Sequence, residues 1–198
     1  MRFLIAVLVS LFSLSALAQA VPPPVLAAKA WALVDHATGQ ALAEKDADAR
    51  IEPASLTKLM TAYITFAKLK EGSLKPDQVV PVSTKAWRME GSRMFIEPNK
   101  PVTADELIRG VIVQSGNDAC VALAETIAGS EEAFAALMNR EAQRLGMTNT
   151  NFTNSTGLPD PQLYTTARDL ARLASAIVRD FPDYYSLYSL KEFTYNGI

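Results

Sequence analysis

The sequence predicts an α/β protein of the α+β kind, rich in helices and carrying a small antiparallel sheet. Apolar residues recur at helical spacing in several stretches, each bounded by a capping or glycine signal. A short strand–turn–strand pattern precedes these stretches, and strand-like alternation from Lys191 to Tyr195 follows them. We therefore expect a helical body with a β-hairpin at its beginning and an unpaired strand at its end.

The predicted hairpin joins Trp31–Val34 to Gln40–Ala43 through a turn at Thr38-Gly39. After the first predicted helix, prolines and glycines interrupt the sequence up to Pro101, and no long hydrophobic periodicity is present there. Within that interval, two short apolar pieces could pair as minor strands. They are Val79-Val80 and Met94–Ile96.

Helical periodicity predicts five helices. They run from Pro53 to the residue before Gly72, from Thr103 to Val113, from Ala119 to Ala128, from Ser130 to Leu145, and from Thr166 to about Asp180. Pro53 suits a first helical turn, where its missing N–H is not needed. Thr103 and Glu106 form a capping-box pattern, in which each side chain bonds the other residue's free backbone N–H.

The first twenty residues predict a secretory signal peptide. Arg2 provides a charged start, Phe3 to Leu17 form an almost unbroken apolar run, and Ala18-Gln19-Ala20 is a cleavage site. A transmembrane anchor is the weaker alternative because this apolar run is short. Residues 21–198 are then expected to form one exported domain, with no second stretch long enough to span a membrane.

Composition excludes several kinds of partner and site. A net charge of −2 gives no basic surface, so a nucleic-acid partner is not expected. The single cysteine, Cys120, permits no internal disulfide, and its apolar neighbours predict a buried thiol. The single histidine, His36, lies in the predicted turn, which excludes a histidine-rich zinc site and disfavours a serine–histidine–aspartate triad. We expect neither a metal nor a cofactor.

The segment Pro53–Met60 contains the pattern S-x-x-K, formed by Ser55 and Lys58. Positions three apart in a helix lie on one face, so the hydroxyl and the amine are expected to be neighbours. The rest of this helix is apolar, which predicts burial, and desolvation of a lysine favours its neutral form. A neutral amine could take the serine proton and activate a nucleophile. On this motif alone, a solvated serine and a solvated lysine remain the alternative.

A second motif, Ser115-Gly116-Asn117, interrupts two apolar helical stretches. Alone it is ordinary turn chemistry, because glycine and asparagine tolerate unusual backbone dihedral angles. Together with S-x-x-K it forms two of the three parts of the signature S-x-x-K, S-x-N and K-T-G. Penicillin-binding proteins and class A β-lactamases carry this signature.

With these motifs the sequence resembles the low-molecular-mass penicillin-binding proteins, which are serine-type D-alanyl-D-alanine carboxypeptidases. The likeness also covers Gly91–Phe95, Thr165–Ala171 and Lys191–Ile198, and spans essentially all of residues 21–198. The resemblance implies a β-lactamase/transpeptidase-like fold, with a helical subdomain and an antiparallel sheet.

The sequence departs from the family's pattern in two places. It ends before the position of K-T-G, so we expect residues 21–198 to be a catalytic domain that lacks its C-terminal strands, one active-site wall and one oxyanion-hole N–H. The family's β-rich second domain and C-terminal membrane anchor are likewise expected to lie outside this sequence. The connection from Trp87 to Met94 is also shorter than in some relatives.

The resemblance implies a role for each motif residue. Ser55 is the nucleophile, Lys58 its base, Ser115 relays a proton to the departing D-alanine, and Asn117 binds the substrate amide. The implied partners are a peptidoglycan stem peptide ending in D-Ala-D-Ala and β-lactam antibiotics. The implied location is the periplasm, at the outer face of the inner membrane, with membrane association only through the C-terminal anchor.

Alternative functions remain open at this point. A D,D-endopeptidase would use the same residues. A class A β-lactamase would need a carboxylate to activate a deacylating water, and none of the candidates lies in that enzyme's usual glutamate context; they are Glu125, Glu131, Glu132, Asp160 and Asp169. A non-catalytic penicillin sensor or an inactive fragment is the alternative from another class.

Overall fold

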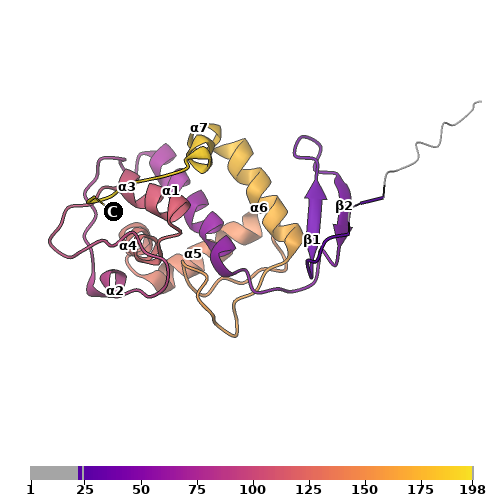
Figure 1. Ribbon diagram of the computed structural model, residues 1–198, viewed down its shortest axis with the longest axis horizontal. Coiled ribbons are helices and arrows are strands. Elements are labelled where there is room, and N and C mark those ends of the chain that lie inside the picture. Colours follow the sequence, from indigo (N-terminus) through magenta and orange to yellow (C-terminus); the bar gives the residue numbers. More distant parts are fainter. Residues whose placement is uncertain (1–21, 24, 198) are drawn as a thin grey trace, which may run out of the picture.

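The computed structural model describes residues 22–23 and 25–197, so the predicted signal peptide lies outside the described residues. The helices gather into one body, and a two-stranded hairpin lies beyond α6 at one end (Figure 1). This arrangement matches the predicted combination of a helical body and a small antiparallel sheet. Along the described part of the chain, no helix has both the length and the apolar character needed to cross a bilayer.

The hairpin consists of β1 (Trp31–Val34) and β2 (Ala41–Lys45), which pair antiparallel with Trp31 opposite Lys45. Asp35 orders the turn, because its Oδ1 accepts bonds from the backbone N–H and the hydroxyl of Thr38, each at 2.7 Å. The predicted hairpin is therefore confirmed, with its second strand displaced by about one residue. α6 packs against β1 and joins the hairpin to the helical body.

The helix predicted from Pro53 has two parts. Ala54–Thr57 form a 3₁₀ turn, η1, and α1 (Lys58–Glu71) continues from it. The helix ends at Gly72, whose φ of 76° places it in the left-handed region that glycine adopts without a Cβ clash. In a 3₁₀ turn, residues three apart are nearly eclipsed, so this start keeps Ser55 directly beside Lys58.

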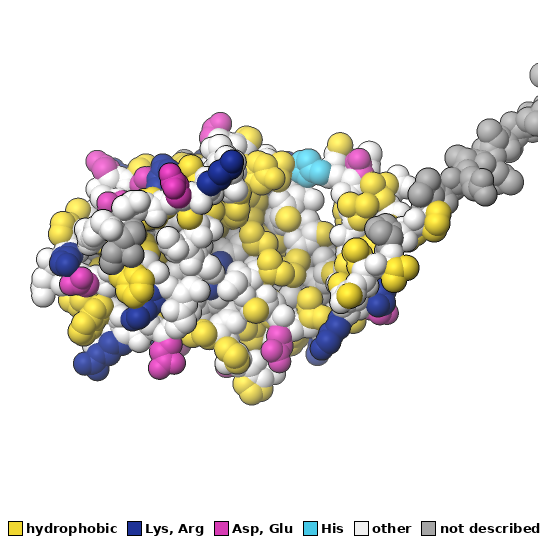
Figure 2. Space-filling model, in the orientation of Figure 1, with side chains coloured by type: hydrophobic (Ala, Val, Ile, Leu, Met, Phe, Trp, Pro, Cys, Tyr) yellow, Lys and Arg dark blue, Asp and Glu magenta, His cyan; other side chains and the backbone are white. Residues whose placement is uncertain are grey.

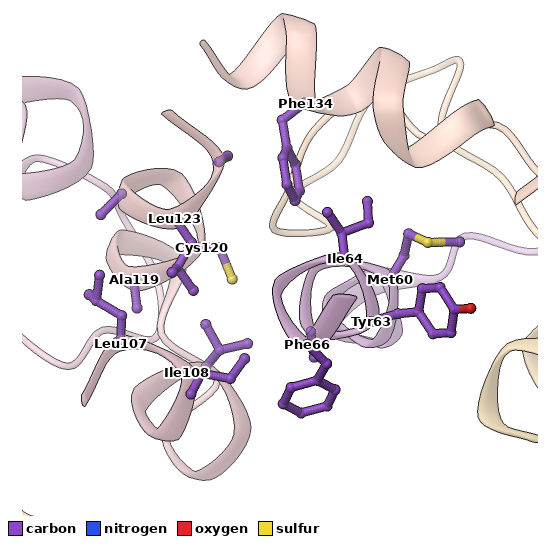
Figure 3. Close-up of a cluster of buried hydrophobic side chains, with 14 of the residues drawn as sticks. Met60, Tyr63, Ile64, Phe66, Leu107, Ile108, Ala119, Cys120, Leu123 and Phe134 are labelled. Carbon is purple, nitrogen blue, oxygen red and sulfur yellow. The ribbon is translucent and has the colours of Figure 1, made fainter. Parts of the chain in front are cut away.

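α1 lies at the centre of the helical body. It packs against α3, α4, α5 and α6. Figure 3 shows Ile64 and Phe66 of α1 facing Ile108 of α3 and Cys120 of α4, while Phe134 of α5 points toward Ile64. All of these side chains are buried, which fixes α1, and therefore the start of α1, relative to its neighbours.

The remaining helices include the four others that were predicted and three short ones that were not. They are α2 (Thr84–Trp87), α3 (Ala104–Val113), α4 (Asn117–Ala128), α5 (Glu131–Arg144), α6 (Ala167–Asp180), α7 (Pro182–Tyr185) and the 3₁₀ turn η2 (Ser186–Ser189). The capping box of Thr103 and Glu106 is present, and Ser130 and Thr166 cap α5 and α6 by accepting backbone N–H bonds. α2, α7 and η2 were not predicted, since four residues are too few to show a helical period.

The predicted strand over Lys191–Tyr195 is wrong. This segment is irregular, and no neighbouring strand pairs with it among the described residues. The alternation of side chains was present, but a strand also needs a partner for its backbone groups. Of the two predicted minor strands, Val79 makes one isolated bridge to Thr103, whereas Met94–Ile96 forms none.

Some apolar side chains near the hairpin remain exposed. Leu33 and Leu42 of the two strands are more than half exposed, and Tyr185 of α7 is nearly half exposed. Figure 2 shows hydrophobic side chains on this face of the molecule, over the junction between the helical body and the hairpin. Apolar side chains are therefore buried around α1, whereas several near this junction are exposed.

Candidate active site

Ser55 and Lys58 meet at the start of α1. Lys58 Nζ lies 3.4 Å from Ser55 Oγ, at the long end of hydrogen-bond distance. Ser55 is exposed, whereas Lys58 is only 6% exposed. Lys58 Nζ also donates a hydrogen bond to the carbonyl oxygen of Thr156, at 2.7 Å. The structure therefore brings together a reachable hydroxyl and a buried amine, as the motif predicted.

Burial lowers the pKa of Lys58, because removal from water disfavours the charged ammonium. The thiol of Cys120 on α4 is close enough to influence this amine electrostatically. Burial raises the pKa of Cys120 to about 12, so this thiol stays protonated at neutral pH and contributes no compensating charge. The predicted buried thiol is confirmed, and the burial of Lys58 favours the neutral form of its amine.

A loop between α5 and α6 holds the backbone that carries Ser55. Ala54 has a φ of 46°, a left-handed conformation that costs a non-glycine residue about 1–2 kcal/mol. Gly157, with a φ of 86°, lies against this residue, and a Cβ on Gly157 would overlap the Ala54 carbonyl group. The close backbone approach therefore requires a glycine at position 157.

The second motif lies at the junction of α3 and α4, and α4 packs against α1. Ser115 has a φ of 55° and is half-buried. Asn117 is 4% exposed; its Nδ2 donates to the Glu90 carbonyl and its backbone N–H to the Ser92 carbonyl, both at 2.7 Å. These bonds fix the orientation of the Asn117 amide. Within the described residues, Ser115 makes no side-chain hydrogen bond to Ser55 or Lys58.

Asp118 organises the segment beside Asn117. Its Oδ1 accepts from the backbone N–H of Met94 at 3.0 Å, and its Oδ2 from that of Ile96 at 3.1 Å. Asp118 is 1% exposed and lies in the first turn of α4, where the helix N-terminus favours a negative charge. These bonds take the place of strand pairing over Met94–Ile96 and attach that segment to the second motif.

The sequence did not identify Thr156, Gly157 or Asp118 as parts of the site. Thr156 and Gly157 belong to a loop that reads only as polar, and Asp118 reads as the first-turn acid of a helix. The glycine at position 157 was the available signal in the sequence, because a glycine within Asn154–Leu158 is typical of a tight turn. Its contact with the Ser55 segment is made only in three dimensions.

The two buried candidates for a deacylating carboxylate, Glu131 and Asp169, are bonded to groups other than Ser55 and Lys58. Glu131 is buried, but its Oε1 accepts two bonds from Ser155 and its Oε2 pairs with Lys85. Asp169 is buried and bonded to Asn149, Thr150 and Arg172. Neither carboxylate has an oxygen directed at Ser55 in the described bonds, which disfavours the class A β-lactamase mechanism.

No group of three or more histidine, cysteine, aspartate or glutamate residues is arranged to hold a metal ion in the described part of the chain. His36 is exposed in the hairpin turn, as predicted. The groups that the structure places at the candidate site are a hydroxyl, an amine and hydrogen-bonding amides.

Comparison with known proteins identifies the family. A family model described as D-alanyl-D-alanine carboxypeptidase (Peptidase_S11) matches residues 17–198. The chain belongs to this family. D-alanyl-D-alanine carboxypeptidase DacC of Escherichia coli K12 is 46% identical over 186 residues, which are 91% of this chain and 46% of that relative. The chain spans about half the length of the curated family members it matches.

Solved structures give the same result for the fold. Penicillin-binding protein 5 from Haemophilus influenzae matches with a TM-score of 0.88 and 44% identity, over 90% of this chain and 53% of that one. Penicillin-binding protein D2 from Listeria monocytogenes, in its ampicillin-bound form, matches with a TM-score of 0.79 and 27% identity, over 88% and 71% of the two chains. The chain therefore has the mixed α/β fold of the penicillin-binding proteins, as the resemblance implied.

The contact between Gly157 and Ala54 leads to a prediction with a matched control. Gly146→Ala places an alanine at a φ of 76° in open space, and we expect a loss of about 1–2 kcal/mol in unfolding free energy. Gly157→Ala adds overlap with a backbone carbonyl, so we expect a loss of about 2–5 kcal/mol. Urea unfolding of both variants of the native protein measures the difference. Equal losses would contradict the proposed close approach.

Proposed function

We propose that the protein is a serine-type D-Ala-D-Ala carboxypeptidase that removes the terminal D-alanine of peptidoglycan pentapeptides through an acyl-enzyme on Ser55. The observation that carries this proposal is the buried amine of Lys58 beside the exposed hydroxyl of Ser55 in a chain of this family. An exposed nucleophile and a desolvated base are what attack on an amide carbonyl requires.

In the proposed reaction, Lys58 takes the Ser55 proton as Ser55 Oγ bonds to the carbonyl carbon between the two D-alanines. The carbon–nitrogen bond of the tetrahedral intermediate then breaks. The proton passes from Lys58 through the Ser115 hydroxyl to the departing D-alanine nitrogen. A water molecule hydrolyses the ester and releases the shortened peptide, and Ser55 recovers its proton.

Asn117 is proposed to position the substrate. Its Nδ2 donates a hydrogen bond to the Glu90 carbonyl, and its Oδ1 is proposed to accept a hydrogen bond from an amide N–H of the stem peptide. The Ser55 backbone N–H is proposed to bind the developing oxyanion, which is where a donor lowers the barrier most. The protein is proposed to need no metal or cofactor, because serine, lysine and amide groups supply each step.

A stem peptide ending in D-Ala-D-Ala is the proposed substrate, and β-lactams are proposed to acylate Ser55 in the same way. The ampicillin-bound form of the Listeria neighbour supports the second part. We propose export to the periplasm, at the outer face of the inner membrane through a C-terminal anchor of the family's kind. Nucleic acid is not a proposed partner.

A D,D-endopeptidase is the second candidate. A D-alanyl-D-alanine endopeptidase from Pseudomonas aeruginosa is 32% identical over 92% of this chain and 61% of that relative. Both reactions cleave a bond after D-alanine and would use the same nucleophile. The higher identity to the carboxypeptidases favours the first candidate.

Replacement of the nucleophile tests the proposal. In the native protein, Ser55→Ala should abolish both fluorescent-penicillin labelling and D-alanine release, because no other group can form the ester. Ser73→Ala, at an exposed serine after the far end of α1, should leave both unchanged. Labelling that survives in Ser55→Ala would overturn the assignment, and labelling of the native protein without D-alanine release would favour a penicillin sensor.

The pH dependence of acylation tests the role of Lys58. The reactive amine is neutral, so the acylation rate constant should rise with pH through the pKa of Lys58. Burial places this midpoint below the ordinary lysine value of 10.5. Rates with a chromogenic cephalosporin across neutral and alkaline pH measure the midpoint. A rate that falls as pH rises through neutrality would contradict a neutral amine base.

Substrate preference separates the two candidates. D-alanine release from a free pentapeptide should be faster than cleavage of a cross-linked peptide dimer at equal concentration. Chromatography of both digests gives the two rates, and Ser55→Ala should stop both. A reversed preference would favour the endopeptidase.

A further inference from the structure

Glu131, in the first turn of α5, holds the loop that contacts the proposed base. Its Oε1 accepts from the backbone N–H of Ser155 at 3.1 Å and from the Ser155 hydroxyl at 2.7 Å. Glu131 is 8% exposed and Ser155 is fully buried. A buried carboxylate is costly unless it is well bonded, so these contacts are a fixed feature of the loop.

The other side of the same loop contacts α1. The Ser155 carbonyl accepts from the Thr61 hydroxyl at 2.7 Å, and the neighbouring Thr156 carbonyl accepts from Lys58 Nζ at 2.7 Å. Two consecutive carbonyls therefore attach the loop to α1, while Glu131 attaches it to α5. The Thr156 carbonyl lies beside both attachments, in a turn where Asn154 Oδ1 also accepts from the backbone N–H groups of Thr156 and Gly157.

We propose that Glu131 is a positioning residue for Lys58, because it fixes Ser155 and so holds the Thr156 carbonyl against the amine. This inference rests on the proposed function, in which Lys58 is the base for Ser55. Glu131 is not a catalytic residue, since both of its oxygens are bonded to the loop and to Lys85.

The contribution of Glu131 is that of a hydrogen-bond acceptor. Lys85 balances its charge at 2.9 Å, but Lys85 is 45% exposed at its side chain and also pairs with Glu132 at 3.2 Å. Glu132 is 78% exposed and makes no bond to Ser155 in the described structure. Glu131 and Glu132 thus both pair with Lys85, and of these two carboxylates only Glu131 bonds to the loop, through Ser155. A glutamine at position 131 would keep the acceptor oxygen.

Release of the loop would affect Lys58 in two ways. The Thr156 carbonyl would no longer orient the amine toward Ser55, and water would reach a group whose pKa is lowered mainly by burial. The titratable group that acts on Lys58 among the described residues, Cys120, stays neutral because burial raises its pKa to about 12. Hydration of Lys58 would therefore move its pKa up toward the ordinary lysine value.

The test compares three variants of the native protein by the rate constant for Ser55 acylation as a function of pH. Glu131→Ala should lower this rate constant about 10- to 100-fold near neutral pH, because misplaced catalytic groups lose rates of that order. It should also raise the pH midpoint by roughly one unit or more. Glu131→Gln should restore most of the rate and the original midpoint. Glu132→Ala, the matched control, should change neither.

The outcomes distinguish this inference from the proposed function. If the native protein itself fails to acylate at Ser55, the proposed function fails. If the native protein acylates and Glu131→Ala keeps its rate and midpoint, the positioning role is overturned. A loss of stability with an unchanged midpoint would show a structural role only and would also overturn it.

A second variant covers the case in which Glu131→Ala does not fold. Ser155→Ala removes the 2.7 Å hydroxyl bond but keeps the 3.1 Å backbone bond to Glu131. We expect a smaller decrease in the acylation rate constant and a shift of the midpoint in the same direction. An unchanged rate and midpoint in Ser155→Ala would overturn the proposal.

Discussion

The bond between Lys58 Nζ and the Thr156 carbonyl is the contact on which the site depends. This bond gives one N–H of the buried Lys58 amine a hydrogen-bond acceptor. Without such a partner, a lysine at this depth would be an unsatisfied polar group, which costs more than a single hydrogen bond contributes. The loop therefore provides a hydrogen-bond partner that a lysine at this depth needs.

The apolar character of α1 explains why this arrangement is stable. Helices pack around α1, and the side chains that face them are fully buried, including Met60, Ile64 and Phe66. A close-packed core resists small displacements, so the first turn of α1 has little freedom. Ser55 precedes this segment in a 3₁₀ turn and is exposed, so its hydroxyl lies at the surface beside the buried amine of Lys58.

The sequence predicted the parts of the fold and site that depend on local spacing. The S-x-x-K pair, the capping box at Thr103 and the end of α1 at Gly72 each follow from residues within one or two turns of each other. The same reasoning failed at Lys191–Tyr195, where the pattern of a strand was present without a partner to pair with. Local periodicity defines the face a segment can bury, whereas pairing depends on another part of the chain.

The parts of the site that the sequence missed all depend on distant residues. Lys58 and Thr156 are 98 positions apart, and Glu131 reaches Ser155 across 24 positions. In each case the residue type was ordinary for its local context, a helix-start acid or a turn residue. A motif can therefore name candidate reacting groups, but the burial that lowers the pKa of Lys58 depends on contacts made only in three dimensions. In this protein, the Ser55–Lys58 pair lies at the start of α1, and the carbonyl that bonds Lys58 comes from the loop between α5 and α6.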